Sequence, residues 1–268
     1  MNYKLDRKSQ RKVVGLIPAA GRAARIKPLP CSKELFPVGF RLRKGEHNAS
    51  PKVVCHYLLE KMRLAGVTTA YIILRKGKWD IPAYLDDGSM LGMHLAYLMM
   101  GLPYGVPFTI DQAYPFVKDA EIVFGFPDIL FEPDDAFVQL LSRQTISHCD
   151  VVLGLFPADR PSKVDMLDLA HDGRVREIII KPRKTQLQLT WGIAVWGPTF
   201  TLFMHQYLKK VKDLVATRPE LFIGEVINAS IHEGLKVEAV QVSEKPFLDI
   251  GTVDDLQRAV KRWVIPAV

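Results

Sequence analysis

Four cationic side chains stand close together near the start of the sequence: Arg22, Arg25, Lys27 and Lys33. They begin within a loop of small residues (19–24), which follows an apolar run expected to form a buried strand (13–17). Small residues let a ligand come close to the backbone, and successive free N–H groups can hold phosphate oxygens. The pattern predicts a triphosphate site, although an ordinary strand-to-loop turn with solvated basic residues would look the same. Neither the Walker A sequence nor the G-x-G-x-x-G dinucleotide motif is present in this loop.

Two aspartates far apart in the sequence could hold a metal ion. Asp128 comes just after an expected buried strand (121–125), at the end where open α/β sheets place their ligands. Asp249 stands in a Leu-Asp-Ile-Gly-Thr turn, where Gly251 permits a close approach of the backbone. Mg²⁺ in nucleotide sites takes few carboxylates and completes its shell with phosphate oxygens and water. The alternative is that Asp128 caps a helix and Asp249 only forms a turn.

Strand-like and helix-like segments alternate along the chain, which favours a mostly parallel sheet covered by helices. Residues 53–65, 134–147, 200–212, 224–232 and 253–263 are expected to form helices. An Asp-Gly pair at 172–173 predicts a hairpin, and residues 76–109 are assigned only to a strand and loops. We expect a basic N-terminal arm over residues 1–12 and one domain over residues 13–268.

Charge and cysteine content exclude several classes of protein. The arm carries five basic residues and one acidic residue, so it accounts for +4 of the formal charge of +7. The rest of the chain shows no basic stripe interleaved with aromatic residues, which argues against a nucleic-acid partner. The three cysteines are widely spaced, and no apolar run is long enough to span a membrane. A cytoplasmic protein without disulfides, zinc or membrane partners is therefore expected.

Four segments of the sequence occur in an order typical of one enzyme family: residues 16–28 continued by Ser32-Lys33, then 124–128, 175–182 and 248–252. Together they resemble the sugar-1-phosphate nucleotidyltransferases, and most of all the glucose-1-phosphate thymidylyltransferase and uridylyltransferase branch. The resemblance implies a single-domain α/β/α, Rossmann-like fold of the glycosyltransferase-A type, with a mixed, mostly parallel sheet. It also implies transfer of a nucleotidyl group from a nucleoside triphosphate, dTTP or UTP, to a sugar 1-phosphate, with release of pyrophosphate.

The resemblance assigns roles to particular residues. Arg25 and Lys33 would be catalytic: Arg25 would hold the triphosphate and stabilise the departing pyrophosphate, and Lys33 would neutralise the α-phosphate region. Asp128 and Asp249 would bind Mg²⁺. The remaining implied contacts are nucleotide binding by Ala19, Ala20, Gly21 and Arg22, and sugar-phosphate binding by Lys181 and Gly192. The enzyme would act as a monomer or a small homo-oligomer.

The sequence departs from the family pattern in two places. Ala23 and Ala24 stand where the signature has Gly-Thr, and alanine disfavours the positive φ that glycine adopts readily. On the sugar side, Ile180 replaces the Glu of Glu-Lys-Pro, and Asp165 aligns with an expected glycine. The sugar and the base therefore stay open.

Two other functions fit parts of the pattern. A non-catalytic sensor of nucleotides or sugar nucleotides would explain Ala23, Ala24 and Ile180, but it would not need both metal aspartates. A glycosyltransferase that uses a finished sugar nucleotide would usually carry an Asp-x-Asp motif, and the sequence has none.

Overall fold

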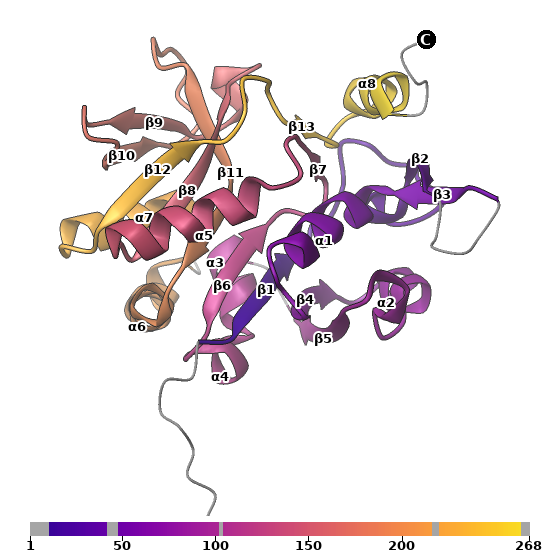
Figure 1. Cartoon of the computed structure of the whole chain (residues 1–268), viewed down its shortest axis with the longest axis horizontal. Coiled ribbons are helices and arrows are strands. Elements are labelled where there is room, and N and C mark those ends of the chain that lie inside the picture. Colours follow the sequence, from indigo (N-terminus) through magenta and orange to yellow (C-terminus); the bar gives the residue numbers. More distant parts are fainter. Residues whose placement is uncertain (1–10, 42–47, 102–103, 216–219, 264–268) are drawn as a thin grey trace, which may run out of the picture.

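The computed structural model describes residues 11–41, 48–101, 104–215 and 220–263. Its main feature is a sheet of nine strands with helices packed against it (Figure 1). In spatial order the main path runs β10 (Val175–Ile179), β9 (Met166–Leu169), β11 (Leu189–Trp196), β6 (Glu121–Gly125), β1 (Val13–Pro18), β4 (Thr69–Arg75) and β5 (His94–Met100). Off this path, β8 (Val151–Pro157) pairs with β11, and β12 (Val237–Gln241) pairs with β8.

The centre of the sheet is parallel and one flank is antiparallel. β1 runs parallel to β4 and β6, β4 runs parallel to β5, and β12 runs parallel to β8. β11 runs antiparallel to β6 and β8. This arrangement is the mixed sheet that the sequence predicts.

The core lies on both faces of the sheet, because successive strand residues point to opposite sides. In β1, Val14 and Leu16 pack in one apolar cluster while Ile17 packs in another. The first cluster includes residues of α3 (Val106–Asp111), α6 (Pro198–Val215) and α7 (Ile223–His232). The second includes residues of α1 (Val54–Leu64), α2 (Asp80–Leu85) and α5 (Ala136–Ser147). The fold is therefore a three-layer α/β/α sandwich.

Smaller elements complete the molecule. These are β2 (Pro37–Arg41), β3 (Ser50–Val53), β7 (Ile129–Leu130), β13 (Leu248–Asp249), α4 (Tyr114–Val117), α8 (Val253–Trp263) and the 3-10 turns η1 (Lys33–Leu35), η2 (Ser89–Leu91) and η3 (Pro161–Lys163). β7 pairs with β13, and α8 lies beside this pair at one end of the molecule (Figure 1).

The structure confirms most expected elements and corrects one region. β9 and β10 form the predicted antiparallel hairpin, with Gly173 at φ +84° in its turn. Residues 76–109 contain α2, η2 and the start of α3 besides the expected strand, β5. α2 and α3 have six residues each, too few to show a helical repeat of apolar positions.

Most of the predicted N-terminal arm lies outside the described residues. Of its described part, Arg11 forms an ion pair with Glu121 at 2.9 Å, and the carbonyl of Lys12 accepts a hydrogen bond from the Glu121 N–H. The expected boundary at residue 13 stays a prediction. Among the described helices, none combines the length and the apolar character that crossing a membrane requires.

Candidate active site

The two predicted metal aspartates lie side by side although they are distant in the sequence. Asp128 lies between β6 and β7, and Asp249 is the last residue of β13, paired with Ile129 of β7. The N–H of Ile250 donates to the carbonyl oxygen of Asp128 at 2.9 Å, which fixes one turn against the other. Burial and the charge of Asp128 raise the pKa of Asp249 to about 6, against the opposing effect of Lys33 and Arg25.

Lys33 contacts Asp128 and is close enough to Asp249 to be affected by its charge. Its ammonium forms an ion pair with Asp128, and η1, which begins at Lys33, presents the side chain to the site. Burial acts to lower the pKa of Lys33, but the charges of Asp128 and Asp249 together raise it above its ordinary value. Lys33 is therefore fully charged at neutral pH and directed at the predicted metal site.

Arg25 approaches the same turn from the other side. A Cβ atom built on Gly251 would lie 2.9 Å from Nη2 of Arg25 and 3.4 Å from Oδ2 of Asp249. The absence of a side chain at position 251 thus lets the guanidinium and the carboxylate meet over the backbone. This is the close approach that the sequence predicts for this glycine.

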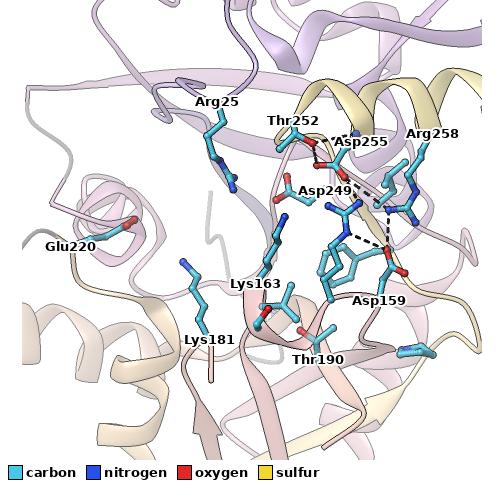
Figure 2. A pocket seen from close by; sticks show the side chains of 16 residues that line it. Arg25, Asp159, Lys163, Lys181, Thr190, Glu220, Asp249, Thr252, Asp255 and Arg258 are labelled. Carbon is cyan, nitrogen blue, oxygen red and sulfur yellow. Dashed lines mark hydrogen bonds and ion pairs between the residues drawn. The ribbon is translucent and has the colours of Figure 1, made fainter. Parts of the chain in front are cut away.

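A cavity of about 590 Å³ opens beside these residues, and Figure 2 shows its lining. The side chains of Arg25, Lys163 and Lys181 come from different parts of the chain and converge on the space around Asp249 (Figure 2). Three cations around one open space form a site suited to phosphate groups.

An ion-pair network forms one wall of this cavity. Arg160 contacts Asp255 at 3.0 Å, Arg258 contacts Asp159 at 2.9 Å, and the hydroxyl of Thr252 donates to Asp255 at 2.6 Å (Figure 2). These contacts tie α8 to the loop between β8 and η3. They therefore hold the turn that carries Asp249.

A second cavity, of about 220 Å³, adjoins the aspartates on the side of β11. Asp128, Asp249, Lys181 and Gly192 line it, so the predicted sugar-phosphate residues and the metal aspartates share one space. A Cβ atom on Gly192 would lie 3.1 Å from the Phe247 ring and 3.2 Å from Ile129, because both pack closely against this glycine. A side chain at position 192 would require Phe247 and Ile129 to shift by a few tenths of an ångström.

Lys181 adopts an unusual backbone conformation for a lysine, with φ at +40°. Its ammonium lies 4.0 Å from the centre of the Phe222 ring, in a cation–π contact. Strained residues persist where the surrounding structure holds them, and they cluster at functional sites. Lys181 lines both cavities, so its strained backbone conformation occurs at the candidate site.

The backbone groups of the small-residue loop differ in their surroundings. The N–H of Ala19 donates to the carbonyl of Ile73 at 2.9 Å, so this amide is already hydrogen bonded within the protein. Nucleotide binding by Ala19 stays a prediction. Gly21 is exposed, with nothing within 4 Å of a Cβ built on it. Its backbone remains open to a ligand, and Ala20 beside it is buried.

The four cations of the opening motif divide between two places. Arg22, Lys27 and Lys33 line a third cavity, of about 550 Å³, together with Lys78. Arg25 lines the first cavity instead. The cations therefore flank the site from two sides, with Lys33 at the junction, and do not form a single row.

Ala23, which replaces the signature glycine, has φ at +51°. The loop thus keeps a left-handed conformation that glycine would adopt more easily. Alanine at position 23 makes this loop conformation less favourable in energy than glycine would, but the backbone still adopts it.

The residues present fit a divalent cation. Two neighbouring carboxylates that repel one another favour a cation between them, and the charge of Asp128 does raise the pKa of Asp249. In the described ranges no group of three or more His, Cys, Asp or Glu side chains is arranged to hold a metal. A metal here would take further ligands from phosphate and water, which is the coordination that Mg²⁺ prefers.

Several residues of the site carry no signal in the sequence. Lys163 and Trp191 line the cavities, and the buried ion pair of Lys78 with Glu34 at 2.5 Å supports η1 beneath Lys33. Glu34 could have drawn attention because it follows Lys33 directly. Lys163, Trp191 and Lys78 stand in no pattern that could have identified them.

Comparison with known proteins identifies the family. The profile of the family described as "Nucleotidyl transferase" matches residues 14–263, which is most of the chain. The chain belongs to this family, and the resemblance stated from the sequence is confirmed.

Curated relatives in the same family are similar over nearly the whole chain. A low-salt glycan biosynthesis nucleotidyltransferase (Agl11) of Haloferax volcanii is 24% identical over 249 residues, which cover 91% of this chain and 64% of the relative. A glucose-1-phosphate thymidylyltransferase of Streptomyces antibioticus is 25% identical over 246 residues, which cover 90% and 63%. The chain thus spans somewhat less than two thirds of the length of these relatives.

Solved structures show the same fold. A putative glucose-1-phosphate thymidylyltransferase from Bacillus anthracis superposes with a TM-score of 0.77 at 22% identity, covering 93% of this chain and 94% of the other. A UDP-glucose pyrophosphorylase superposes with a TM-score of 0.73 at 16% identity, covering 94% and 98%. The predicted fold class is confirmed.

Proposed function

We propose that the protein transfers a nucleotidyl group from a nucleoside triphosphate to a sugar 1-phosphate in a Mg²⁺-dependent reaction. One observation carries the proposal: Arg25, Lys33 and the pair of Asp128 and Asp249 meet at a single site in a chain of the nucleotidyl transferase family. The four residues come from three separate segments of the sequence. A protein that bound neither phosphate groups nor a metal ion would gain nothing from placing these charges together.

The proposed reaction joins two anions, so the main task of the protein is to position them and neutralise their charge. An oxygen of the sugar 1-phosphate attacks the α-phosphorus, and the bond from this phosphorus to the leaving pyrophosphate breaks. Lys33 faces the point of attack, and Arg25 stabilises the charge on the departing pyrophosphate. Lys181 binds the phosphate of the sugar from the side of β11.

Asp128 and Asp249 would hold the Mg²⁺ ion. When bound, the ion would neutralise phosphate charge and orient the triphosphate. Until then Lys33 neutralises Asp128 through the ion pair, so the site keeps its charge balance.

For the substrates, we propose dTTP or UTP and a hexose 1-phosphate. Support comes from two relatives, which are glucose-1-phosphate thymidylyltransferases of Streptomyces species at 25% and 23% identity. A cytoplasmic location and a monomer or small homo-oligomer remain predictions.

The proposal is tested by a matrix of substrates. Pyrophosphate release is measured with dTTP, UTP, CTP, ATP and GTP, each combined with a panel of hexose 1-phosphates, in folded protein with MgCl₂. Turnover with at least one pair is expected. Tight nucleotide binding by calorimetry without turnover on any pair would favour the non-catalytic sensor instead.

A further inference from the structure

Two buried polar atoms beside the smaller cavity have no hydrogen-bond partner among the described residues. They are Oδ1 of Asp165 and Nε1 of Trp191, and both residues line the cavity of about 220 Å³. Trp191 is only 6% exposed. Leaving such groups unpaired is costly, so their presence in a folded protein calls for an explanation.

The two atoms complement one another chemically. The carboxylate oxygen of Asp165 accepts hydrogen bonds, and the indole N–H of Trp191 donates one. Asp165 precedes β9, and Trp191 lies in β11 beside Gly192. The pairing of β11 with β8 is irregular between Trp191 and Ile193, as in a β-bulge. A bulge turns side chains away from the regular alternation of a strand, which lets Trp191 and Gly192 line one space.

The protein makes room for Asp165 and keeps its charge poorly solvated. A Cβ on Gly224 would lie 3.1 Å from Oδ2 of Asp165 and 2.6 Å from Cδ1 of Ile180, so a larger residue at position 224 would require these side chains to shift. Burial raises the pKa of Asp165 to about 6, although the charge of Lys181 and a hydrogen bond from the Lys181 backbone to this carboxyl act to lower it. The atom without a partner is Oδ1. Glu220 and Glu225 add to the raised value.

Much of the surrounding wall is apolar. The apolar residues of the cavity lining are Val106, Phe126, Ile129, Val164, Phe222, Ile223 and Phe247. A ligand pocket of this kind is mostly apolar, with a few placed polar groups that fix the ligand's orientation. The other polar groups lining it are the predicted metal aspartates, Lys181 and Glu220.

We propose that Asp165 and Trp191 select the sugar by hydrogen bonding its hydroxyl groups, with Asp165 accepting a hydrogen bond and Trp191 donating one. The inference rests on the proposed function and extends it to the sugar specificity of this chain. Neither atom is accessible from the cavity as the side chains stand, so binding requires a small rotation of both side chains. A sugar seated with its phosphate toward Lys181 would then offer hydroxyl groups, which both donate and accept, to the two atoms. A site built to hydrogen bond a hydroxyl rejects an analogue that lacks it, because its own buried groups are left unpaired.

The test uses single-deoxy analogues of the substrate. The probe is glucose 1-phosphate or, where the substrate matrix identifies another, the hexose 1-phosphate with the highest turnover. Its monodeoxy analogues are compared with wild-type protein, Asp165→Ala, Asp165→Asn and Trp191→Phe. Trp191→Phe keeps an aromatic ring and removes the N–H. Asp168→Asn, three residues further along in β9 and absent from the cavity lining, is the matched control.

In wild-type protein we expect removal of one particular hydroxyl to lower kcat/KM by about tenfold or more. In Asp165→Ala this loss should shrink to less than about threefold, because the partner of that hydroxyl is already gone. Trp191→Phe should raise KM for the sugar 1-phosphate and leave KM for the nucleotide unchanged. Asp168→Asn should behave as wild type.

The outcomes separate this inference from the proposed function. Wild-type protein without turnover on any substrate pair contradicts the proposed function, and the inference falls with it. Turnover by wild type with the same deoxy penalties in Asp165→Ala and Asp165→Asn contradicts the inference alone. An equal loss for every analogue would mean that Asp165 acts only by positioning Lys181, which also contradicts direct recognition.

Discussion

At the scale of single residues, the site depends on charges that are costly to bury. Asp128 directly precedes β7 and Asp249 ends its partner strand β13, and the charge of Asp128 helps to raise the pKa of Asp249. Lys33 and Arg25 offset part of this repulsion. In the proposed reaction the metal ion would take over this role once the triphosphate is bound.

Replacing either aspartate by asparagine tests the metal assignment. We expect Asp128→Asn and Asp249→Asn each to lower kcat by at least about a thousandfold, because the amide removes one of two anionic ligands. Stability should rise for Asp249→Asn, because the repulsion between the carboxylates is lost, and fall for Asp128→Asn, because Lys33 loses its ion-pair partner. Pyrophosphate release and urea unfolding measure the two effects. Activity that survives both changes would contradict the assignment.

The sequence revealed those site residues that carry a motif and missed those that do not. Arg25, Lys33, Asp128 and Asp249 each stand in a short pattern that indicates phosphate or metal chemistry. Trp191 and Lys163 reach the same space only through a strand irregularity and a 3-10 turn. A single sequence contains no local signal for such placements, because they depend on distant packing.

At the scale of elements, the loop after β1 combines a strained alanine with an ordinary one. Ala23 has φ at +51°, whereas Ala24 is not among the residues with positive φ. A non-glycine residue in the left-handed region costs roughly 1–2 kcal/mol. The loop therefore retains the conformation of a glycine without having one.

This difference predicts opposite effects from the same substitution at neighbouring positions. Ala23→Gly relieves the backbone strain, and Ala24→Gly only adds freedom to the unfolded chain. We expect Ala23→Gly to be the more stable of the two by about 1 kcal/mol. The free energies of unfolding from urea titrations provide the measurement. Equal stability, or a more stable Ala24→Gly, would show that Ala23 is not strained.

A buried ion pair supports the turn that presents Lys33. Lys78 and Glu34 are 4% and 2% exposed, and they connect the loop after β4 to η1. Burial raises the pKa of Glu34, and Lys78 opposes this effect. Removing one member of such a pair leaves an uncompensated buried charge.

Lys78→Met should therefore destabilise the protein by about 3 kcal/mol. The matched control is Lys76→Met, because Lys76 is exposed and lies two residues away in the same loop. In the double variant Glu34→Gln/Lys78→Met, part of the lost stability should return. A single Lys78→Met variant as stable as Lys76→Met would contradict a structural role for the pair.

The succession of main strands and long helices along the chain could be predicted from the alternation of apolar segments, because long elements repeat their pattern several times. The region over residues 76–109 did not, because α2 and α3 are only six residues long. Their ends are set by contacts with the sheet, which the sequence alone does not display. Element length thus decided which parts of the fold could be predicted.

At the scale of the whole molecule, the three-layer fold brings the residues proposed for the two substrates together at one end of the sheet. The segments after β1 and β6 carry the cations and Asp128, and β11 with the loops around it carries the groups predicted for the sugar. Asp249, in the turn before α8, lines both the larger and the smaller cavity. Two substrates could therefore meet at a shared metal ion between them.

The central claim is the transfer of a nucleotidyl group, and isotopic labelling tests it most directly. The protein is incubated with MgCl₂, a hexose 1-phosphate and either dTTP or UTP labelled at the α-phosphate, and the products are separated. We predict that the label appears in a nucleoside diphosphate sugar, that unlabelled pyrophosphate is released in equal amount, and that EDTA stops both. Label that stays in the triphosphate with every hexose 1-phosphate tested, in folded protein with Mg²⁺, would contradict the account.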